Sequence, residues 1–407
     1  MKITFLTEND YQGGLDTFIV TLINNWPNDQ DEITLICNRN HPGIKRYERD
    51  ITRKVRFEWH GLLLLNDIKR SLHNVFGRPE IIAKVLFRFV RLFHYSFFNY
   101  YTRALRKVIF KDSPDKLMVI NGGYPAGMTC RAAVICWGKY SKKKGAILNF
   151  HNLAMEINKD PKRENKIDRQ VHDYSSQLIS VSHTSAESLR VRSEFSKTTK
   201  LGFIYNGIAP IVSQKSDLGI KKELGLPEGA RMCLMLGSYE PRKGHDFLLK
   251  SFRKVVDELP GAHLVICGQG SVQEVAHVQQ ITNDLGLREN VHLQSFRNDL
   301  NVLLESTDLL LISSQAYESF GLTAVEAMAR KVPVVATNTG GLKEVVKNGE
   351  GGFAFNNTDQ DAYAAKVVEL LKNSALRSEQ GVKGYQRFSE NFTASRMAEE
   401  YARLLHS

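Results

Sequence analysis

The order of short apolar runs along the chain is the feature that most constrains its fold. Residues 2–7 read as a strand, a turn at Gln12-Gly13-Gly14 and a helical pattern follow, and residues 33–37 read as the next strand. A strand, a turn, a helix and another strand in this order are how a parallel α/β sheet begins. Short, mostly apolar runs are typical of strands that are buried on both faces of such a sheet.

Two such series are present. Residues 117–121, 146–150 and 177–182 continue the first, and a polar stretch at 209–230 then interrupts the pattern and resembles a linker. The second series starts with a strand at 232–237 and a helix at 245–258, and its later strand candidates are 263–267, 291–293, 308–313, 332–337 and 352–355. We therefore expect two doubly wound α/β domains, joined near 207–215, in this chain of 407 residues. Their ligand site would lie beyond the carboxyl ends of the strands, in the cleft between facing domains.

Two carboxylates follow one strand of the second series at a fixed spacing. Glu318 precedes Gly321 and Glu326 follows it, in the segment ESFGLTAVEAMA. A helix that begins near Leu322 would direct its free backbone N–H groups toward phosphate oxygens. Acceptor groups on both sides of such a pocket suit the hydroxyl groups of a nucleotide sugar. Each Glu taken alone also fits a solvated side chain on an ordinary helix.

Other turns also carry chemical information. Arg242 and Lys243 follow the strand at 232–237, and two cations there can neutralise a diphosphate leaving group in place of a divalent metal. Gly340-Gly341 would allow the backbone to approach a ligand closely, or would form an ordinary turn. The Asp-x-Asp triplets at 29–31 and 359–361 resemble metal-binding carboxylate pairs, but neither ends a predicted strand. We therefore expect both triplets to be solvated turns.

Together these segments resemble the family 4 retaining glycosyltransferases, also called glycosyl transferases group 1, whose GT-B fold has two Rossmann-like domains. The resemblance covers nearly the whole chain and includes Gly13-Gly14, Phe150-His151-Asn152 and Tyr205-Asn206-Gly207. It implies an N-terminal acceptor domain at 1–208, a donor domain at 209–387 and a C-terminal helix, 388–407, that returns to the first domain. In this family the variable region, here 55–140, usually recognises the acceptor.

The resemblance also implies roles for single residues. Glu318 would contact the donor sugar and Glu326 the ribose, while Arg242 and Lys243 would hold the diphosphate and His151 would lie near the reacting carbon. The remaining donor contacts would come from Gly13, Gly14, Ser319, Phe320, Gly321, Leu322, Thr323, Arg297 and Asn298, the last two near the base. Many family members carry Arg close after the glycine that corresponds to Gly237; here Ser238 stands there and Arg242 is the nearest arginine. No metal or other cofactor is expected, and retention would follow from departure and attack on the same face.

Basic residues are concentrated in one part of the chain. Residues 51–150 hold 19 basic and 5 acidic residues, whereas residues 201–407 hold 22 and 24, so the first region carries the net charge of +11. Within 79–111, Lys84, Arg88 and Arg91 share one helix face and aromatic residues are dense. This pattern is typical of a helix at an anionic membrane surface, and it equally fits a core-packed helix pair with a solvated basic face. It also permits single-stranded nucleic acid, which we do not expect as a partner.

The remaining features concern the compartment. The spacings of the five Cys match no zinc site, which predicts buried free thiols in a reducing compartment. We find no secretory signal and no apolar window of about 18 residues that would span a bilayer. These observations predict a cytoplasmic protein, peripheral on the inner face of the cytoplasmic membrane.

The leading hypothesis is a retaining hexosyltransferase. It would move a hexose from a nucleotide sugar to a glycan or lipid-linked glycan in surface-polysaccharide or lipopolysaccharide biosynthesis, and the frequency of donors in the family favours UDP over GDP. An epimerase of nucleotide sugars with the same fold is an alternative enzyme. A non-catalytic basic protein that binds membranes or nucleic acid is an alternative of another class, and it explains the charge but not the ordered second half.

Overall fold

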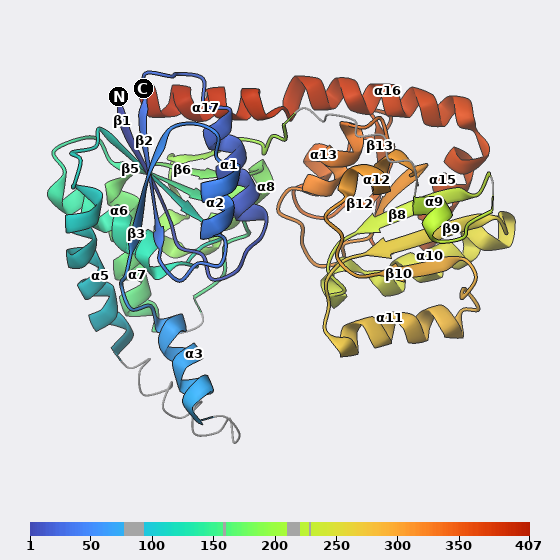
Figure 1. The fold of residues 1–407 in the computed structure, drawn as a ribbon, viewed down its shortest axis with the longest axis horizontal. Helices are drawn as coiled ribbons and strands as arrows, with labels where there is room; N and C mark the ends of the chain where they lie inside the picture. The colour runs from blue at the N-terminus through green and yellow to red at the C-terminus, as the bar shows by residue number, and fades with distance from the viewer. Residues whose placement is uncertain (77–92, 158–159, 210–219, 228) are drawn as a thin grey trace. The chain divides into compact units, whose positions relative to one another are not determined.

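The computed structural model describes residues 1–76, 93–157, 160–209, 220–227 and 229–407. They form two compact units (Figure 1): unit 1 comprises Met1–Ile204 with Met397–Ser407, and unit 2 comprises Tyr205–Arg396. Each unit is built on one parallel sheet whose successive strands are connected through helices, as the alternating pattern predicts. Among the helices of these described ranges, none is long and apolar enough to cross a bilayer.

Unit 1 has seven strands in the order β3-β2-β1-β4-β5-β6-β7. The strands are β1 (Lys2–Thr7), β2 (Glu32–Asn38), β3 (Val55–His60), β4 (Lys116–Asn121), β5 (Ala146–Phe150), β6 (Ser175–Ser180) and β7 (Leu201–Phe203). The helices are α1 (Gly14–Asn24), α2 (Ile44–Asp50), α3 (Leu65–Phe76), α5 (His94–Ile109), α6 (Met128–Tyr140), α7 (Pro161–Tyr174) and α8 (His183–Glu187), followed by the 3-10 turns η2 (Ser188–Val191) and η3 (Ser193–Phe195).

The sheet of unit 1 is buried on both faces. In β4, Leu117 and Val119 belong to the core that contains α5 and α6, whereas Met118 and Ile120 belong to the core that contains α1. Successive side chains of a strand point to opposite faces, so a strand covered on both sides needs apolar residues at every position. This requirement explains why the central strands could be located from short apolar runs.

Unit 2 has six strands in the order β10-β9-β8-β11-β12-β13. The strands are β8 (Arg231–Leu236), β9 (Ala262–Cys267), β10 (Val291–Gln294), β11 (Leu309–Ile312), β12 (Val334–Thr337) and β13 (Gly352–Phe355). The helices are α9 (Ile220–Glu223), α10 (His245–Glu258), α11 (Val272–Asp284), α12 (Leu300–Glu305), α13 (Leu322–Met328), α14 (Leu342–Val345), α15 (Gln360–Lys372) and α16 (Ser374–Asn391), with one 3-10 turn, η4 (Pro241–Lys243).

The last helix, α17 (Ala394–His406), contributes to the core of unit 1, as predicted. Met397, Tyr401 and Leu405 are buried in the same cluster as Phe5 and Phe18. The rings of Phe18 and Tyr401 lie edge to face, with their centroids 5.7 Å apart. The C-terminal residues of the chain therefore complete a core that its N-terminal residues begin.

The triplet at 29–31 was predicted to be a solvated turn. This prediction is wrong for Asp31, which is buried. Its carboxylate accepts hydrogen bonds from Trp26 Nε1 at 2.9 Å and pairs with His406 Nε2 at 2.8 Å. Asp29 is exposed as expected. In the second triplet, Asp359 caps α15 by accepting from the backbone N–H of Ala362. Neither triplet gathers ligands: the described residues contain no group of three or more His, Cys, Asp or Glu placed to hold a metal ion.

The basic stretch is only partly described. Lys84, Arg88 and Arg91 lie outside the described residues. Within α5, Phe98 and Tyr101 are buried in the core of unit 1, whereas Arg103, Arg106 and Lys107 are exposed. The five Cys are all free and buried, as predicted, and they are Cys37, Cys130, Cys136, Cys233 and Cys267. For α5, the structure therefore shows a core-packed helix with a solvated basic face.

Candidate active site

An ion pair joins two of the predicted site residues in unit 2. Lys243 ends η4, just after β8, and Glu318 lies in the loop between β11 and α13. Because β8 and β11 are neighbouring parallel strands, the loops at their carboxyl ends meet. The Lys243 ammonium lies 2.6 Å from Glu318 Oε2, and Ser314 Oγ donates to the same oxygen at 3.1 Å. The structure therefore brings together a cation and a carboxylate that the sequence places 75 residues apart.

The turn that carries Lys243 is held by the end of β11. Ser313 Oγ donates to the carbonyl oxygen of Lys243 at 2.8 Å. The backbone N–H of Gln315 donates to the carbonyl oxygen of Arg242, also at 2.8 Å. Gly244 has a φ of 74°, and a Cβ there would come within 2.0 Å of the Ser313 carbonyl oxygen. This close approach requires glycine. The position of Lys243 is thus fixed by backbone contacts and does not depend on its side-chain ion pair.

Gly340 and Gly341 support Glu318 from the opposite side. The backbone N–H of Gly341 donates to the Glu318 carbonyl oxygen at 2.7 Å. Gly340 has a φ of 57°, and a Cβ there would lie 2.2 Å from the same oxygen. The close backbone approach expected at these glycines is therefore found, but its partner is the loop of Glu318. The two glycines therefore hold the backbone of Glu318 in place.

Helix α13 begins at Leu322, where the sequence predicts it. Gly321 is its N-cap with a φ of 102°, a backbone conformation that favours glycine. Phe320 is buried and packs on the rings of Tyr205 and Phe392, both with centroids 5.8 Å from its own. The segment from Ser319 to Thr323 thus turns from the loop into the helix, and the buried ring of Phe320 holds it against these two aromatic rings.

Glu326 lies one turn into α13, and little compensates for the burial of its carboxylate. Burial raises its pKa to about 7, and the nearby Arg330 guanidinium opposes this shift only in part. Arg330 donates instead to the Glu326 backbone carbonyl at 2.9 Å and to Asn301 Oδ1. Among the described residues, the Glu326 carboxylate has no hydrogen-bond donor. A half-buried carboxylate without a donor is suited to accept hydrogen bonds from a ligand.

The other predicted cations of unit 2 are engaged elsewhere. Arg242 Nε lies 2.5 Å from Glu240 Oε2, and its guanidinium lies 5.2 Å from the centre of the Tyr317 ring. Arg297 forms ion pairs with both Glu223 and Asp299. Asn298, beside it, is exposed. Binding of a base at Arg297-Asn298 remains a prediction. A base that stacked on the Arg297 guanidinium would meet a group whose orientation is already fixed by two carboxylates.

His151, in unit 1, follows β5 and is a neutral imidazole. Burial lowers its pKa to about 3, so the ring is uncharged near neutral pH. Its Nε2 lies 2.7 Å from Asn149 Oδ1, and the Asn149 amide nitrogen donates to the hydroxyl of Tyr401 at 2.8 Å. An amide oxygen only accepts, so Nε2 carries the proton and Nδ1 keeps its lone pair. The ring of Phe18 lies edge to face with that of His151, centroid to centroid 4.2 Å.

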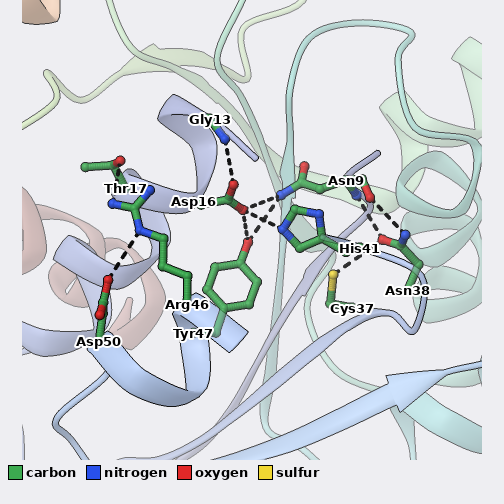
Figure 2. Close-up of polar contacts among 10 residues, drawn as sticks. All are labelled: Asn9, Gly13, Asp16, Thr17, Cys37, Asn38, His41, Arg46, Tyr47 and Asp50. Atoms are coloured by element: carbon green, nitrogen blue, oxygen red, sulfur yellow. Dashed lines mark hydrogen bonds and ion pairs between the residues drawn. The ribbon is translucent and has the colours of Figure 1, made fainter. Parts of the chain in front are cut away.

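Gly13 and Gly14 stand at the start of α1, beside the carboxyl end of β1. Both are exposed, and a Cβ added to either would meet no atom within 4 Å. Behind them, the carboxylate of Asp16 accepts the Gly13 backbone N–H at 2.8 Å and belongs to a buried polar network (Figure 2). Asp16 was not among the predicted site residues. An acid at the third helical position after a glycine turn is a capping signal that could have indicated it.

Glu8, which also was not predicted, directly follows β1. One carboxylate oxygen accepts both the backbone N–H of Thr129 at 2.7 Å and its hydroxyl at 2.5 Å. Burial raises the pKa of Glu8, although these bonds act in the opposite direction. Because β1, β4 and β5 are successive strands of the sheet, Glu8 and His151 follow strands that flank the same middle strand, β4.

Most of unit 2 is similar to a known protein family. Residues 218–387 match the family described as glycosyl transferases group 1. The chain is 29% identical over 199 residues to the N-acetyl-alpha-D-glucosaminyl L-malate synthase of Bacillus anthracis, which is 49% of this chain and 51% of that protein. It is 25% identical over 187 residues to the lipopolysaccharide core biosynthesis glycosyltransferase LpsE of Rhizobium meliloti, 46% of this chain and 53% of that protein. The chain spans about half the length of these curated relatives.

The fold is similar over the whole chain to that of a solved structure. Anabaena HepE, crystallised in complex with UDP and glucose, superposes with a TM-score of 0.72 and 17% identity, covering 100% of both chains. With the seven- and six-stranded parallel sheets, this likeness identifies the GT-B fold. The family match falls within the unit that contains Lys243, Glu318 and Glu326. Residues 218–387 of this chain therefore match the glycosyl transferases group 1, within a chain that has the GT-B fold.

Proposed function

We propose that this protein is a retaining hexosyltransferase that uses a UDP-sugar as donor. The observation that carries the proposal is the Lys243–Glu318 ion pair at the start of α13, followed one turn later by the unpartnered carboxylate of Glu326. A cation suits a diphosphate, a fixed carboxylate suits sugar hydroxyl groups, and a second carboxylate suits the ribose hydroxyl groups. The complex of HepE with UDP and glucose supports a nucleotide-sugar donor for this fold.

In the proposed reaction, donor binding rearranges the ion pair. The diphosphate competes with Glu318 for the Lys243 ammonium, and Glu318 then accepts hydrogen bonds from the sugar. Arg242 adds a second positive charge if its guanidinium leaves Glu240, 2.5 Å away in the free protein. Positive charge fixed beside the leaving group stabilises it as it departs. Charge from these side chains is the basis for proposing that no metal ion is needed.

Retention requires that the new bond form on the face from which the diphosphate departs. The bond between the sugar C1 and the diphosphate oxygen breaks, and a bond forms between C1 and an acceptor hydroxyl oxygen. The hydroxyl proton passes to the departing diphosphate. The neutral His151 can contribute a hydrogen-bond acceptor, Nδ1, without a charge that would oppose the positive character developing at C1.

We propose a glycan or lipid-linked glycan as the acceptor, in surface-polysaccharide biosynthesis at the cytoplasmic face of the membrane. The role of LpsE in lipopolysaccharide core biosynthesis supports this class of product. The exposed Arg103, Arg106 and Lys107 of α5 support contact with an anionic surface. Flotation with vesicles that contain phosphatidylglycerol tests the membrane contact. Binding should fall as salt is raised and be absent with purely zwitterionic vesicles; no binding at low salt would refute it.

A donor panel tests the activity itself. The protein is incubated with UDP-glucose, UDP-galactose, UDP-N-acetylglucosamine or GDP-mannose in the presence of EDTA, and released nucleoside diphosphate is measured. We expect slow hydrolysis of one UDP-sugar, and NMR of the first sugar released should show the donor's anomeric configuration. Turnover that appears only with added metal would contradict metal independence. Release of the inverted anomer would contradict retention, and turnover of no donor would contradict the proposed function.

A further inference from the structure

A polar cavity of about 770 Å³ lies at the amino ends of three neighbouring strands of unit 1, β1, β2 and β3. Five of the side chains that line it share one face of the sheet, because they are register partners or stand two residues apart in a strand: Lys2, Thr4, Glu32, Thr34 and Arg56. Further along this face, Leu6 and Ile36 belong to the apolar core that contains α5. The face is therefore apolar toward its carboxyl end and polar toward its amino end.

The walls of the cavity are held by buried and ionic contacts. On one side, Arg53 donates to the carbonyl oxygens of Trp26 and Asn28 at 3.1 and 2.6 Å, which fixes the turn before β2. On the other side, the Arg56 guanidinium pairs with Asp112 in the loop between α5 and β4. The volume is within the range of about 300–1,000 Å³ that is usual for small-molecule sites. The cavity is therefore formed before any ligand arrives.

Thr4 contributes a buried hydroxyl to the floor of the cavity. The residue is only 3% exposed, and its Oγ1 has no hydrogen-bond partner in the part of the chain that the structure describes. A parallel strand that is buried at such a position ordinarily carries an apolar residue, and a buried hydroxyl without a partner is unfavourable. Thr7, at the other end of β1, also has a buried hydroxyl without a partner, but it does not line the cavity. A ligand in the cavity can supply the partner that Thr4 lacks.

The charges of the lining are unequally paired. Four acidic and four basic residues line the cavity: Asp29, Asp31, Glu32 and Asp112, with Lys2, Arg53, Lys54 and Arg56. Every acid except Glu32 is paired with Arg53, Arg56 or His406. The ammonium groups of Lys2 and Lys54 form no ion pair with any described residue. Two free ammonium groups and one free carboxylate leave an excess of one positive charge, which suits a ligand with a negative charge.

The uncharged groups narrow the class of ligand. Hydroxyl groups of Thr4 and Thr34 and the amide of Gln30 both donate and accept hydrogen bonds, as sugar hydroxyl groups require. The described lining contains no aromatic residue, so it offers no platform on which a nucleobase would stack. The cavity therefore combines sites for hydroxyl groups with an excess of positive charge.

We propose that this cavity binds an acidic saccharide, a sugar that carries a carboxylate or a phosphate. The free ammonium groups neutralise the acid, and the Thr hydroxyl groups and the Glu32 carboxylate bind the sugar hydroxyl groups. The cavity lies at the amino edge of the sheet, whereas His151 and Gly13 follow strands at the carboxyl edge. β1 has six residues, so the two edges are about 20 Å apart. The proposal goes beyond the sugar transfer proposed above, because binding here needs no nucleotide sugar.

Binding is tested on the whole chain, without a nucleotide sugar, by NMR titration. The four probes are D-glucuronate, D-glucose 6-phosphate, D-glucose and inorganic phosphate. Glucose has hydroxyl groups without charge, and phosphate has charge without a sugar. We expect at least one acidic sugar to bind about tenfold more tightly than either glucose or phosphate. The tighter of the two acidic sugars identifies the acid group, and shifts of the Thr4 and Thr34 amide signals locate the bound probe.

Thr4→Val separates a ligand site from a structural role. The hydroxyl has no partner in the free protein, so the variant should melt at the same temperature or higher, yet it should bind the acidic sugar about fivefold more weakly. Thr7→Val is the matched control, since it removes a buried hydroxyl of the same strand outside the cavity, and it should keep the affinity. Lys54→Ala should weaken binding several-fold, whereas Lys45→Ala, on the exposed surface of α2, should not.

Three results would overturn the proposal. Phosphate that binds as tightly as both acidic sugars would show a site for anions alone. Equal losses of affinity in Thr4→Val and Thr7→Val would show that the cavity hydroxyl has no part in binding. Absence of shifts at Thr4 and Thr34 would place the sugar elsewhere. The proposed transfer is tested separately, because a protein that binds the acidic sugar here but turns over no donor would contradict only the transfer.

Discussion

Glu326 offers a quantitative test, because burial raises its pKa from 4.5 to about 7. Between these two values the folded protein keeps a proton that the unfolded chain releases. The unfolded state therefore binds fewer protons, and the stability of unit 2 falls as pH rises through this window. The pKa difference corresponds to about 3 kcal/mol of cost for the ionised carboxylate above about pH 7. Because the side chain is only half-buried, screening by water reduces the expected cost to about 2 kcal/mol.

Glu326→Gln removes the ionisation and keeps the shape of the side chain. The variant should match the wild-type protein in stability near about pH 5 and exceed it by about 2 kcal/mol near about pH 8. The chain has two units and need not unfold in one step, so amide hydrogen exchange of peptides from 309–337 is the appropriate measurement for unit 2. Glu379→Gln, on the exposed surface of α16, is the control and should show no pH-dependent gain.

The same variant should lose function where it gains stability. Gln presents an amide nitrogen in place of one acceptor oxygen, so we expect UDP to bind at least tenfold more weakly. A stability difference that stays constant from about pH 5 to about pH 8 would refute the assignment of the raised pKa to this carboxylate. A variant that is more stable yet binds UDP as the wild-type protein does would refute its role in the site.

Three further results are expected. Lys243→Ala should reduce hydrolysis of the donor by about a hundredfold at unchanged melting temperature, whereas Lys250→Ala on the exposed face of α10 should have no effect in the same assay. Gly340→Ala should destabilise the protein by at least about 3 kcal/mol in thermal unfolding, because its Cβ would strike a backbone oxygen. Gly286→Ala, also at positive φ but with open space around it, should cost about 1 kcal/mol; equal costs would contradict the steric argument. Nitrogen-15 NMR should show His151 neutral and protonated at Nε2 down to about pH 5; a cationic ring would contradict its burial.

The sequence located the central strands of both sheets and the edge strands β10 and β13 of unit 2, but it missed both edge strands of unit 1. In unit 1 the missed strands are β3, in which apolar and charged residues alternate, and β7, which has only three residues. An edge strand is covered less completely, so its composition is not that of an apolar run. The start of helix α13 was predicted correctly because a glycine marks it locally.

The positions of single residues could be predicted where the signal was local in sequence. Lys243, Glu318 and the start of α13 all follow strand ends, and the sheet order alone brings them together. The Asp31 prediction failed because a decisive partner, His406, is 375 residues away. The Asp16 network escaped notice for a similar reason, since its donors come from three separate segments of the first 47 residues. Such contacts depend on tertiary packing, which the pattern of one chain does not reveal.

The place of α17 in the core of unit 1 has a consequence for synthesis of the chain. Residues 397–407 leave the ribosome only after all of unit 2, which at typical rates takes about ten seconds or more. Until then, the apolar surface around Phe5 and Phe18 has no cover from Tyr401, and Asn149 lacks the hydroxyl that orients it toward His151. Unit 2 can fold as it emerges, whereas the core of unit 1 is completed only by a segment that is made after unit 2. A nascent chain stalled within unit 2 would therefore be a substrate for chaperones through its first domain.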